Sequence, residues 1–247
     1  DAAALSTTAL RSNTQYRLTG TKSFTTNGSE ADVFIILATK DRKLRAAGIE
    51  AFIVERGPGF EVNPQQGKMG MRATSTAELT FNDCAIPSEN MLGVEGSGFK
   101  SLMEILNTSR VCIAAQCVGL AQAAYESAVQ YAKHREAFGR HLSDFQAIRW
   151  SIAEMATNIQ AARLLVHRAA NLKDATKPFI TEASIAKLFS SRVAVESANA
   201  ALQIHGGSGY FAPTTVERLY RDAKVTEIYE GTSEIQRMII ARNILDV

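Results

Sequence analysis

Glu230 is a carboxylate on what the sequence predicts to be the last loop before a terminal helix. It stands in the stretch "YEGTSEIQR", immediately before a glycine and two hydroxyl residues, and a helix-like apolar pattern follows almost to the end of the chain. A carboxylate can abstract a proton from carbon when it lies within hydrogen-bond reach. An acid in a solvated loop, or near a helix start where the helix dipole favours it, is the ordinary alternative. This stretch alone leaves both interpretations open.

Three further stretches combine residues that could bind a ligand. In "KSFTTNGSEADVF" the hydroxyls of Thr25 and Thr26 precede an Asn-Gly turn, although a plain hairpin would also explain them. In "HREAFGR" a charged pair precedes Phe-Gly, which a helix C-cap and a turn would also explain. In "LQIHGGSGY" three glycines in four positions expose backbone N–H groups that can approach a phosphate or a planar ring. A glycine helix stop explains the third stretch equally well.

Composition limits the classes of protein to which the chain can belong. At 247 residues, with 46% hydrophobic and 21% charged residues, the chain can bury a sizeable core and is not generally disordered. The net charge is only +2 and the basic residues form no runs, so composition gives no reason to expect nucleic acid. The longest apolar run is far short of a membrane span, and the opening residues resemble neither a signal peptide nor a presequence.

The cysteines and histidines give no sign of a metal site. Cys84, Cys112 and Cys117 form no CxxC pair. None of them lies next to a histidine; the histidines are His134, His141, His167 and His205. We therefore expect no zinc site, iron–sulfur cluster or disulfide framework, and we expect a reducing compartment.

The sequence pattern that predicts the secondary structure around the candidate residues changes near Pro87, from strands to helices. Before it, runs of β-forming residues with short polar connections predict strands, as in "ADVFIILAT", "GIEAFIVER" and "STAELTFNDCAI". Strands of this length and spacing, with no helical pattern between them, indicate an antiparallel β-barrel or sandwich over residues 1–95.

Helical periodicity after "LGVEGSGF" predicts an antiparallel four-helix bundle over residues 97–247. Apolar residues recur on one helix face up to "HREAFGRHL", which ends the first helix. Ser143 and Gln146 form a capping-box pattern that opens a second helix. A third helix starts near Thr181 and stops at "HGGSGY", and the fourth follows Thr232. The predicted fold class is therefore α+β.

Small residues in the first predicted helix bear on the oligomeric state. Ala114, Ala115, Gly119, Ala123 and Ala124 leave flat faces that a monomer would have trouble covering. The pattern predicts at least a dimer.

Taken together and in this order, the four stretches resemble those of the acyl-CoA dehydrogenase family. The resemblance covers essentially all 247 residues, as the family's middle β domain and C-terminal four-helix domain, and its most specific match is "RDAKVTEIYEGTSEIQR". The chain is most like short-chain or branched short-chain members. The family's N-terminal helical domain is absent, and Asp1 matches the end of a ligand-binding loop. We therefore expect residues upstream of Asp1, and we expect this chain alone to bind the family's FAD cofactor poorly.

The resemblance implies flavin-dependent α,β-dehydrogenation of an acyl-CoA thioester to the trans-2-enoyl-CoA. Glu230 matches the base that removes the α proton, while the β hydrogen leaves as hydride to N5 of FAD. The backbone N–H of Glu230 and a ribityl hydroxyl of the flavin would stabilise the charge that develops on the thioester oxygen. The residues implied to contact the substrate are Asn107, Arg110, Tyr229, Gly231 and Arg242.

The resemblance also implies a set of FAD-binding residues. Phe24, Thr25 and Thr26 match the segment that packs on the isoalloxazine, with Thr26 near N5, although relatives usually carry Trp at the position of Phe24. The other positions fall in a segment that reaches the dinucleotide of a neighbouring subunit, in an adenine-side loop and at the start of the last helix. They are Arg135, Glu136, Ala137, Phe138, Phe145, Gln146, Gln203, Ile204, His205, Gly206, Gly207, Thr232, Ser233 and Glu234.

Partners and location follow from the same resemblance. It implies an acyl-CoA substrate, an electron-transferring flavoprotein as electron acceptor and a homotetramer built as a dimer of dimers. It implies neither nucleic acid nor a membrane span. It places the protein in the bacterial cytoplasm or the mitochondrial matrix.

Two other functions stay open on this fold. Oxidases and monooxygenases of this type usually lack a glutamate at this site or replace it by aspartate, so Glu230 counts against them. A non-catalytic assembly or nucleic-acid-associated relative is the third reading, and the absence of a basic stripe counts against it.

Overall fold

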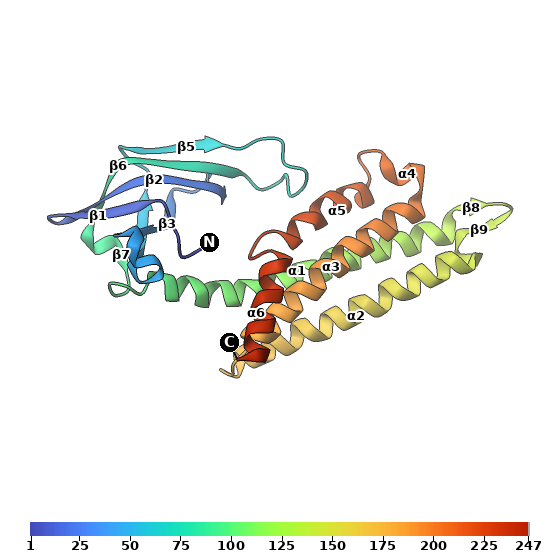
Figure 1. Cartoon of the computed structure of the whole chain (residues 1–247). Coiled ribbons are helices and arrows are strands. Elements are labelled where there is room, and N and C mark those ends of the chain that lie inside the picture. The colour runs from blue at the N-terminus through green and yellow to red at the C-terminus, as the bar shows by residue number, and fades with distance from the viewer. Residues whose placement is uncertain (247) are drawn as a thin grey trace. The chain divides into compact units, whose positions relative to one another are not determined.

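The computed structural model describes residues 1–246, which fall into two compact units (Figure 1). The first unit comprises residues 1–68 and 72–105, and the second comprises residues 69–71 and the chain from Leu106 onward. The division lies inside helix α1 (Gly98–His134), rather than at its start. The domain boundary that the sequence suggests, near residues 95–97, stays a prediction.

The first unit is built around one seven-stranded sheet. Its strands lie in the order β5-β6-β2-β1-β3-β4-β7, and every pair is antiparallel except β1 with β3. Two 3₁₀ helices, η1 (Arg42–Gly48) and η2 (Ser88–Asn90), connect strands. The strands are β1 (Thr8–Ser12), β2 (Gln15–Thr26), β3 (Val33–Thr39), β4 (Ile49–Glu55), β5 (Phe60–Pro64), β6 (Thr76–Pro87) and β7 (Met91–Leu92).

The sheet bends over a single apolar core. Buried and open positions alternate along β3 and β6, as expected for strands with one face inward. Strands β5 and β3 are four places apart in the sheet, yet the ring centroids of Phe60 and Phe34 are only 5.0 Å apart. Strands β5 and β3 therefore face each other across the core, as in the predicted sandwich, and the described strands do not close into a barrel.

The second unit is a helical bundle in which α1, α2 and α3 run side by side (Figure 1). The helices after α1 are α2 (Gln146–Asp174), α3 (Ile180–His205), α4 (Gly207–Tyr210), α5 (Thr215–Ala223) and α6 (Ser233–Leu245). A small hairpin, β8 (Glu136–Ala137) with β9 (Arg140–His141), connects α1 to the 3₁₀ helix η3 (Leu142–Asp144) and α2, while η4 (Lys224–Glu227) follows α5. The predicted α+β fold class is confirmed. None of the helices among residues 1–246 combines the length and hydropathy that crossing a bilayer requires.

Three local features differ from the sequence-based expectations. The capping box is wrong: Phe145 is the N-cap of α2 and Gln146 its first residue, and no side chain caps this end, because Ser143 lies in η3. Helix α5 was not predicted, since it is short and lies within a stretch interpreted as connection. Ala114 and Ala124 lie in the core of the bundle, so they do not form an outer face, because α2 and α3 cover them.

Candidate active site

The turn that carries Glu230 has a left-handed backbone. Glu230 has φ = 55° and Gly231 has φ = 90°, conformations that cost free energy for any residue except glycine. A Cβ at position 231 would also lie 2.7 Å from the side-chain nitrogen Nε2 of Gln236, so that buried side chain would have to shift. The sequence Glu-Gly thus puts the acid at the strained position and the glycine where a side chain would collide.

Helix α6 begins directly after this turn. Thr232 is its N-cap, and its hydroxyl oxygen accepts a hydrogen bond from the backbone N–H of Ile235 at 3.4 Å. Glu234 is exposed in the first turn, where hydrogen bonds from its own backbone N–H and from the Thr232 side chain lower its pKa. The predicted helix start after Thr232 is confirmed, and Thr232 has a structural role as a cap in addition to any ligand contact.

The carboxylate of Glu230 is half-buried and contacts α1. The hydroxyl of Ser109 donates a hydrogen bond to Oε2 of Glu230 and also lies 3.1 Å from the carbonyl oxygen of Leu106. The neighbouring Arg110 is buried, with 5% of its surface exposed, and donates to Oδ1 of Asn107 at 2.6 Å. Burial lowers the pKa of Arg110, while the charge of Glu230 raises it. The structure therefore brings two predicted substrate contacts, Asn107 and Arg110, to the same part of α1 as the carboxylate's partner.

Tyr229, on the other side of Glu230, is fixed to the next stretch of α1. Its hydroxyl donates to Oε1 of Gln116 at 2.7 Å. Burial raises the pKa of Tyr229 to about 12, so the phenol stays protonated at neutral pH. Ser109 and Gln116 thus hold residues 230 and 229 against one helix.

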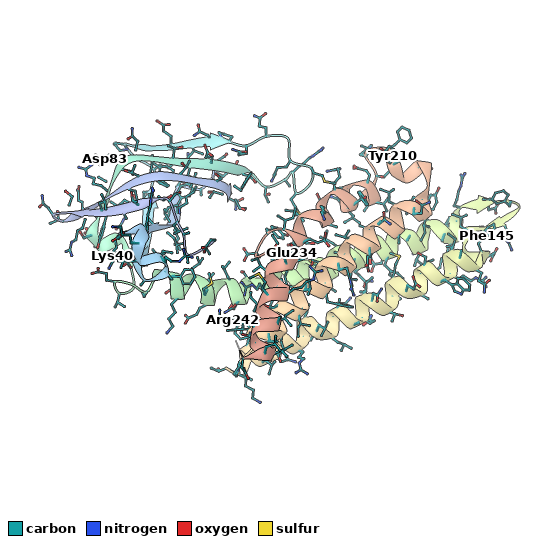
Figure 2. All side chains as sticks on the ribbon, in the orientation of Figure 1. Lys40, Asp83, Phe145, Tyr210, Glu234 and Arg242 are labelled. Atoms are coloured by element: carbon teal, nitrogen blue, oxygen red, sulfur yellow. The ribbon has the colours of Figure 1, made fainter. Side chains whose placement is uncertain are left out.

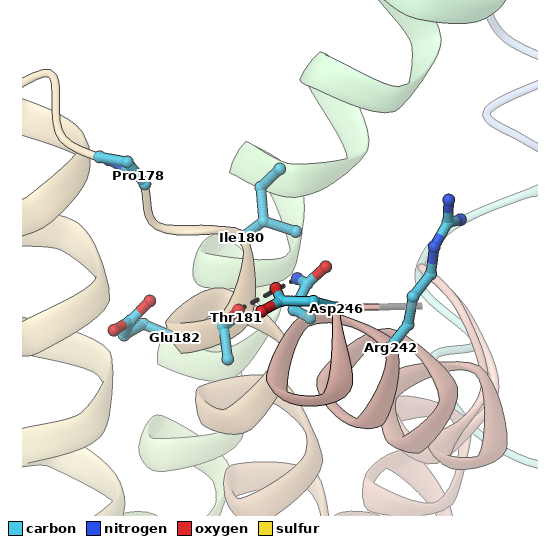
Figure 3. Close-up of a pocket in the computed structure, with 7 residues that line it drawn as sticks. Pro178, Ile180, Thr181, Glu182, Arg242 and Asp246 are labelled. Carbon is cyan, nitrogen blue, oxygen red and sulfur yellow. Dashed lines mark hydrogen bonds between the residues drawn. The ribbon is translucent and has the colours of Figure 1, made fainter.

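Arg242 lies elsewhere on α6, at a separate pocket of about 570 Å³ (Figure 3). Its side chain points away from the hydrogen bond that Asn243 Nδ2 donates to Thr181 Oγ1 at 3.0 Å. Nine residues separate Arg242 from the start of α6, a rise of about 13 Å along the helix axis. The structure does not bring Arg242 to Glu230.

The predicted isoalloxazine segment lies in the first unit, at the end of β2. Phe24 has φ = 57° and 75% of its surface exposed, and the pairing of β2 with β6 shifts register between Lys22 and Thr25. This irregularity turns the ring of Phe24 out of the sheet. Among residues 1–246, no side-chain hydrogen bond is made by Thr25 or Thr26, so both hydroxyls are available to a ligand.

The segment predicted to reach a neighbouring subunit forms the β8–β9 hairpin and the start of α2. Phe138 has 95% of its surface exposed, and its ring centroid lies 6.2 Å from that of Phe145. The guanidinium of Arg140 stacks 3.9 Å from the Phe145 ring centroid. Figure 2 shows Phe145 at one end of the bundle, far from Glu234 on α6. The other predicted residues here, Arg135, Glu136 and Gln146, are exposed, and Ala137 is half-buried.

The predicted adenine-side loop closes α3. Ile204 is buried in the core, with 6% of its surface exposed. His205 is held by Ala201 O at 2.8 Å and Ser127 Oγ at 3.3 Å, and its ring stacks on Tyr131 with centroids 4.2 Å apart. The residues that stay open are Gln203, Gly206 and Gly207.

Two buried residues near the turn were missed by the sequence analysis. Lys187 of α3 and Gln236 of α6 each have none of their surface exposed, and both donate hydrogen bonds to the Glu230–Gly231 turn. A lone lysine among small and apolar residues in "ASIAKLF" was an available signal, since a buried helix face rarely carries a charge. Nothing in the sequence around Gln236 singled it out. Within residues 1–246 no cluster of three or more His, Cys, Asp and Glu side chains could hold a metal ion.

Comparison with models of known protein families assigns the chain to a family. Residues 1–84 match the family model described as "Acyl-CoA dehydrogenase, middle domain", and residues 96–245 match "Acyl-CoA dehydrogenase, C-terminal domain". The chain belongs to the acyl-CoA dehydrogenase family. The resemblance that the four stretches carry is thereby confirmed over both parts of the chain.

Individual relatives within the acyl-CoA dehydrogenase family agree with this assignment. The short-chain specific acyl-CoA dehydrogenase of Rattus norvegicus mitochondria is 48% identical over 99% of this chain and 60% of the relative. The acryloyl-CoA reductase (NADH) of Anaerotignum propionicum is 47% identical over 99% of this chain and 63% of the relative. The solved butyryl-CoA dehydrogenase of Megasphaera elsdenii superposes with a TM-score of 0.96 at 44% identity, covering 98% of this chain and 64% of that one. The chain thus spans less than two thirds of the length of these relatives.

Proposed function

We propose that the protein containing this chain oxidises an acyl-CoA thioester to the trans-2-enoyl-CoA, with Glu230 as the base that takes the α proton. The observation that carries the proposal is the Glu230 turn itself, in a chain of the acyl-CoA dehydrogenase family. A solvated loop acid needs no left-handed backbone and no buried donors behind it. The names of the relatives point to short-chain substrates.

Removal of the α proton requires a carboxylate that stays within hydrogen-bond reach of the substrate's α carbon. The hydrogen bond from Ser109 holds one carboxylate oxygen of Glu230 and leaves the other free for the substrate. The hydrogen bond from Tyr229 to Gln116 fixes the residue before it. Both contacts limit the directions in which the carboxylate can swing, which is how positioning lowers a barrier.

The substrate contacts that we propose are Asn107, Arg110, Tyr229 and Gly231, all on α1 or in the Glu230 turn. Nε of Arg110 is buried without a hydrogen-bond partner in the described part of the chain. A buried donor of this kind is costly unless a ligand or water satisfies it, so it is available to the substrate. For Arg242 we propose only a contact with a distant part of the CoA, because this residue lines a pocket that does not include Glu230.

The open residues of this chain fit FAD. An exposed Phe24 ring beside two unpaired hydroxyls offers a flat face and hydrogen-bond donors to a planar heteroaromatic group. We propose that Phe24, Thr25 and Thr26 hold the isoalloxazine. Thr232, Ser233 and Glu234, at the start of α6, are proposed separately as FAD contacts, with Thr232 hydrogen-bonded to the dinucleotide. The exposed hairpin with Arg135 and the open glycines Gly206 and Gly207 suit a dinucleotide held by another copy of the chain. When bound, FAD supplies the acceptor for the β hydrogen, which leaves as hydride.

Assembly and electron transfer complete the proposal. We propose a homotetramer, built as a dimer of dimers, since Phe145 at the far end of the bundle lies away from Glu234 at the start of α6 (Figure 2). Electrons would pass from the reduced protein to an electron-transferring flavoprotein, in the bacterial cytoplasm or the mitochondrial matrix.

The relative named as a reductase favours a second candidate, the same chemistry run backwards. By microscopic reversibility, a protonated Glu230 would then return the proton to the α carbon of an enoyl-CoA. Oxidation by an external acceptor, measured against reduction of an enoyl-CoA by NADH, separates the two directions. The residues that carry the proton are the same in both.

Replacing Glu230 by glutamine tests the base. In the full-length protein with FAD bound, Glu230→Gln should keep the yellow flavin and bind acyl-CoA within several-fold of the unmodified affinity. Reduction of the flavin by butyryl-CoA should slow by at least about a thousandfold, because hydride cannot leave until the α proton is removed. Glu230→Asp should recover part of the rate, since misplacing the base by about 1 Å costs about a hundredfold. Anaerobic stopped-flow absorbance measures this, and a Glu230→Gln rate close to that of the unmodified protein would place the base elsewhere.

A further inference from the structure

Lys187 is a fully buried cation on α3. None of its surface is exposed, and its neighbours one turn away on the same helix, Ala183, Ser184, Ser190 and Ser191, are buried as well. A buried charge is costly unless hydrogen bonds and opposite charges compensate it. The place of its ammonium group therefore calls for an explanation.

The ammonium group of Lys187 reaches the turn of Glu230. Nζ donates a hydrogen bond to the carbonyl oxygen of Gly231 at 2.8 Å. Gln236, also fully buried, donates from Nε2 to the same oxygen at 3.0 Å and to the carbonyl oxygen of Glu230 at 3.1 Å. Two side chains from different helices thus place three N–H···O contacts on two consecutive carbonyl groups.

These carbonyl groups need outside donors because of their position. They lie before the first backbone hydrogen bond at the start of α6, in which Thr232 O accepts from Gln236 N at 3.0 Å. Their peptides also belong to the left-handed turn at Glu230 and Gly231. Strained backbone of this kind persists only when its surroundings over-determine it. Without the donors, the peptide planes can rotate, and the direction of the Glu230 side chain rotates with them.

The groups around Lys187 shift its pKa in both directions. Burial lowers its pKa, and the nearby guanidinium of Arg110 lowers it further. The carboxylates of Glu227 and Glu230 act in the opposite direction and favour the charged form. The net effect is a lowered pKa, and the charge of Glu230 favours the ammonium form beside the turn that the hydrogen bond of Lys187 reaches.

We propose that Lys187 and Gln236 are positioning residues for the catalytic carboxylate, which act by fixing the two peptide groups of the Glu230–Gly231 turn. This inference rests on the proposed function of Glu230 as base. Neither residue touches the reacting atoms. Each sets where the carboxylate and the N–H of Glu230 stand relative to a bound thioester.

Proton removal can be measured apart from hydride transfer. A CoA thioester in which sulfur replaces the β carbon has exchangeable α hydrogens but no β hydrogen to lose. Exchange of its α hydrogens in deuterium oxide, followed by mass spectrometry with the full-length, FAD-loaded protein, reports the base alone. Lys187→Met and Gln236→Met keep the length of each side chain and remove the donors. Ser190→Ala is the matched control, because its hydroxyl is buried on α3 without a hydrogen-bond partner among the described residues.

Lys187→Met and Gln236→Met should each slow the exchange at least about tenfold, within the about hundredfold that a 1 Å misplacement costs. Affinity for the thioester and melting temperature should stay close to those of Ser190→Ala, which should exchange normally. Exchange at the unmodified rate in both methionine variants would overturn the proposal, provided that Glu230→Gln abolishes exchange. Losses of rate, affinity and stability in proportion would also overturn it, since they describe a purely structural role. Normal exchange by Glu230→Gln would instead refute the proposed function.

Discussion

Ser109 shows how one side chain can serve both protonation states of Glu230. Its hydroxyl carries a single hydrogen but lies against two acceptors, Oε2 of Glu230 and the carbonyl oxygen of Leu106. While Glu230 is ionised, the hydrogen can point to the carboxylate. Once Glu230 holds a proton, it can donate to Ser109, and the hydroxyl can turn to Leu106. The contact would thus persist through the proposed reaction, and the carboxyl group would keep its place when its charge changes.

Lys22 yields a prediction at the same scale. It is partly buried on β2, and burial lowers its pKa to about 8. The pKa of Lys22 in the folded protein lies below its unfolded value of about 10.5. The contribution of Lys22 to stability is therefore fully present above pH 10.5 and is lost as pH falls through 8. At pH 7 the charged side chain therefore opposes folding. Lys22→Met should raise the free energy of unfolding at pH 7 by about 1–2 kcal/mol, a figure reduced for partial exposure.

The gain from Lys22→Met should shrink between pH 8 and pH 10.5. Urea unfolding followed by circular dichroism, with both proteins measured at each pH, gives the difference directly. Groups that titrate in both proteins cancel in this comparison. A difference that does not change with pH would contradict the assigned pKa.

At the scale of elements, the loop between β5 and β6 supplies three residues, Met69–Met71, to the helical unit. The backbone N–H of Met71 donates to Oδ1 of Asp222 at 2.6 Å, and Arg221 donates to the carbonyl oxygen of Met69 at 3.0 Å. Gly70 lies between them, so close to α5 that a Cβ would stand 2.3 Å from the carbonyl oxygen of Arg221. Three residues far away in sequence thus cover the end of α5.

Gly70→Ala should therefore destabilise the protein. The atoms in the way are backbone atoms of α5, which cannot move aside cheaply, so overpacking should lower the free energy of unfolding by about 2 kcal/mol. Gly57→Ala is the control, because a Cβ at Gly57 meets nothing within 4 Å. Thermal unfolding of both variants measures the effect. Equal melting temperatures would contradict the prediction, because they would show that the Met69–Met71 loop can move to accommodate the methyl group.

Strands and long helices were predictable because each repeats a local pattern. The third and fourth helices begin within one residue of their predicted starts at Thr181 and after Thr232. The failures depend on contacts distant in sequence. Ala114 and Ala124 look like surface residues until α2 and α3 cover them, and Ser143 is drawn into η3 instead of capping α2. The motif alone singles out Glu230 as the proposed base, whereas the proposed roles of Lys187 and Gln236 depend on carbonyl groups that the fold brings to them.

At the scale of the whole molecule, the helical unit exposes large apolar side chains on two helices. Trp150 and Leu164 of α2 have 62% and 70% of their surface exposed, and Met238 of α6 has 66%. Ala115 and Gly119 of α1 are exposed as well, which leaves part of the predicted small-residue face open. Apolar surface of this extent usually meets another chain.

The full-length protein should therefore assemble. With FAD bound, light scattering at micromolar concentration should give four times the mass of one chain, and dilution should pass through a dimer, because closed symmetric assemblies commonly form in steps. Leu164→Asp changes an exposed side chain. Circular dichroism should therefore show that each subunit of this variant is still folded. A single-chain mass across the whole concentration range would refute the assembly.

The Met69–Met71 loop has a consequence for recombination between relatives. A crossover placed at the start of α1 would take α5 from one parent and leave its covering loop with the other. A chimaera therefore needs a second crossover, so that the loop and α5 come from one parent. Otherwise the two parents must fit each other where Gly70 packs against the backbone of Arg221. Among natural or laboratory chimaeras, those that inherit loop and helix from the same parent should be the ones that stay folded.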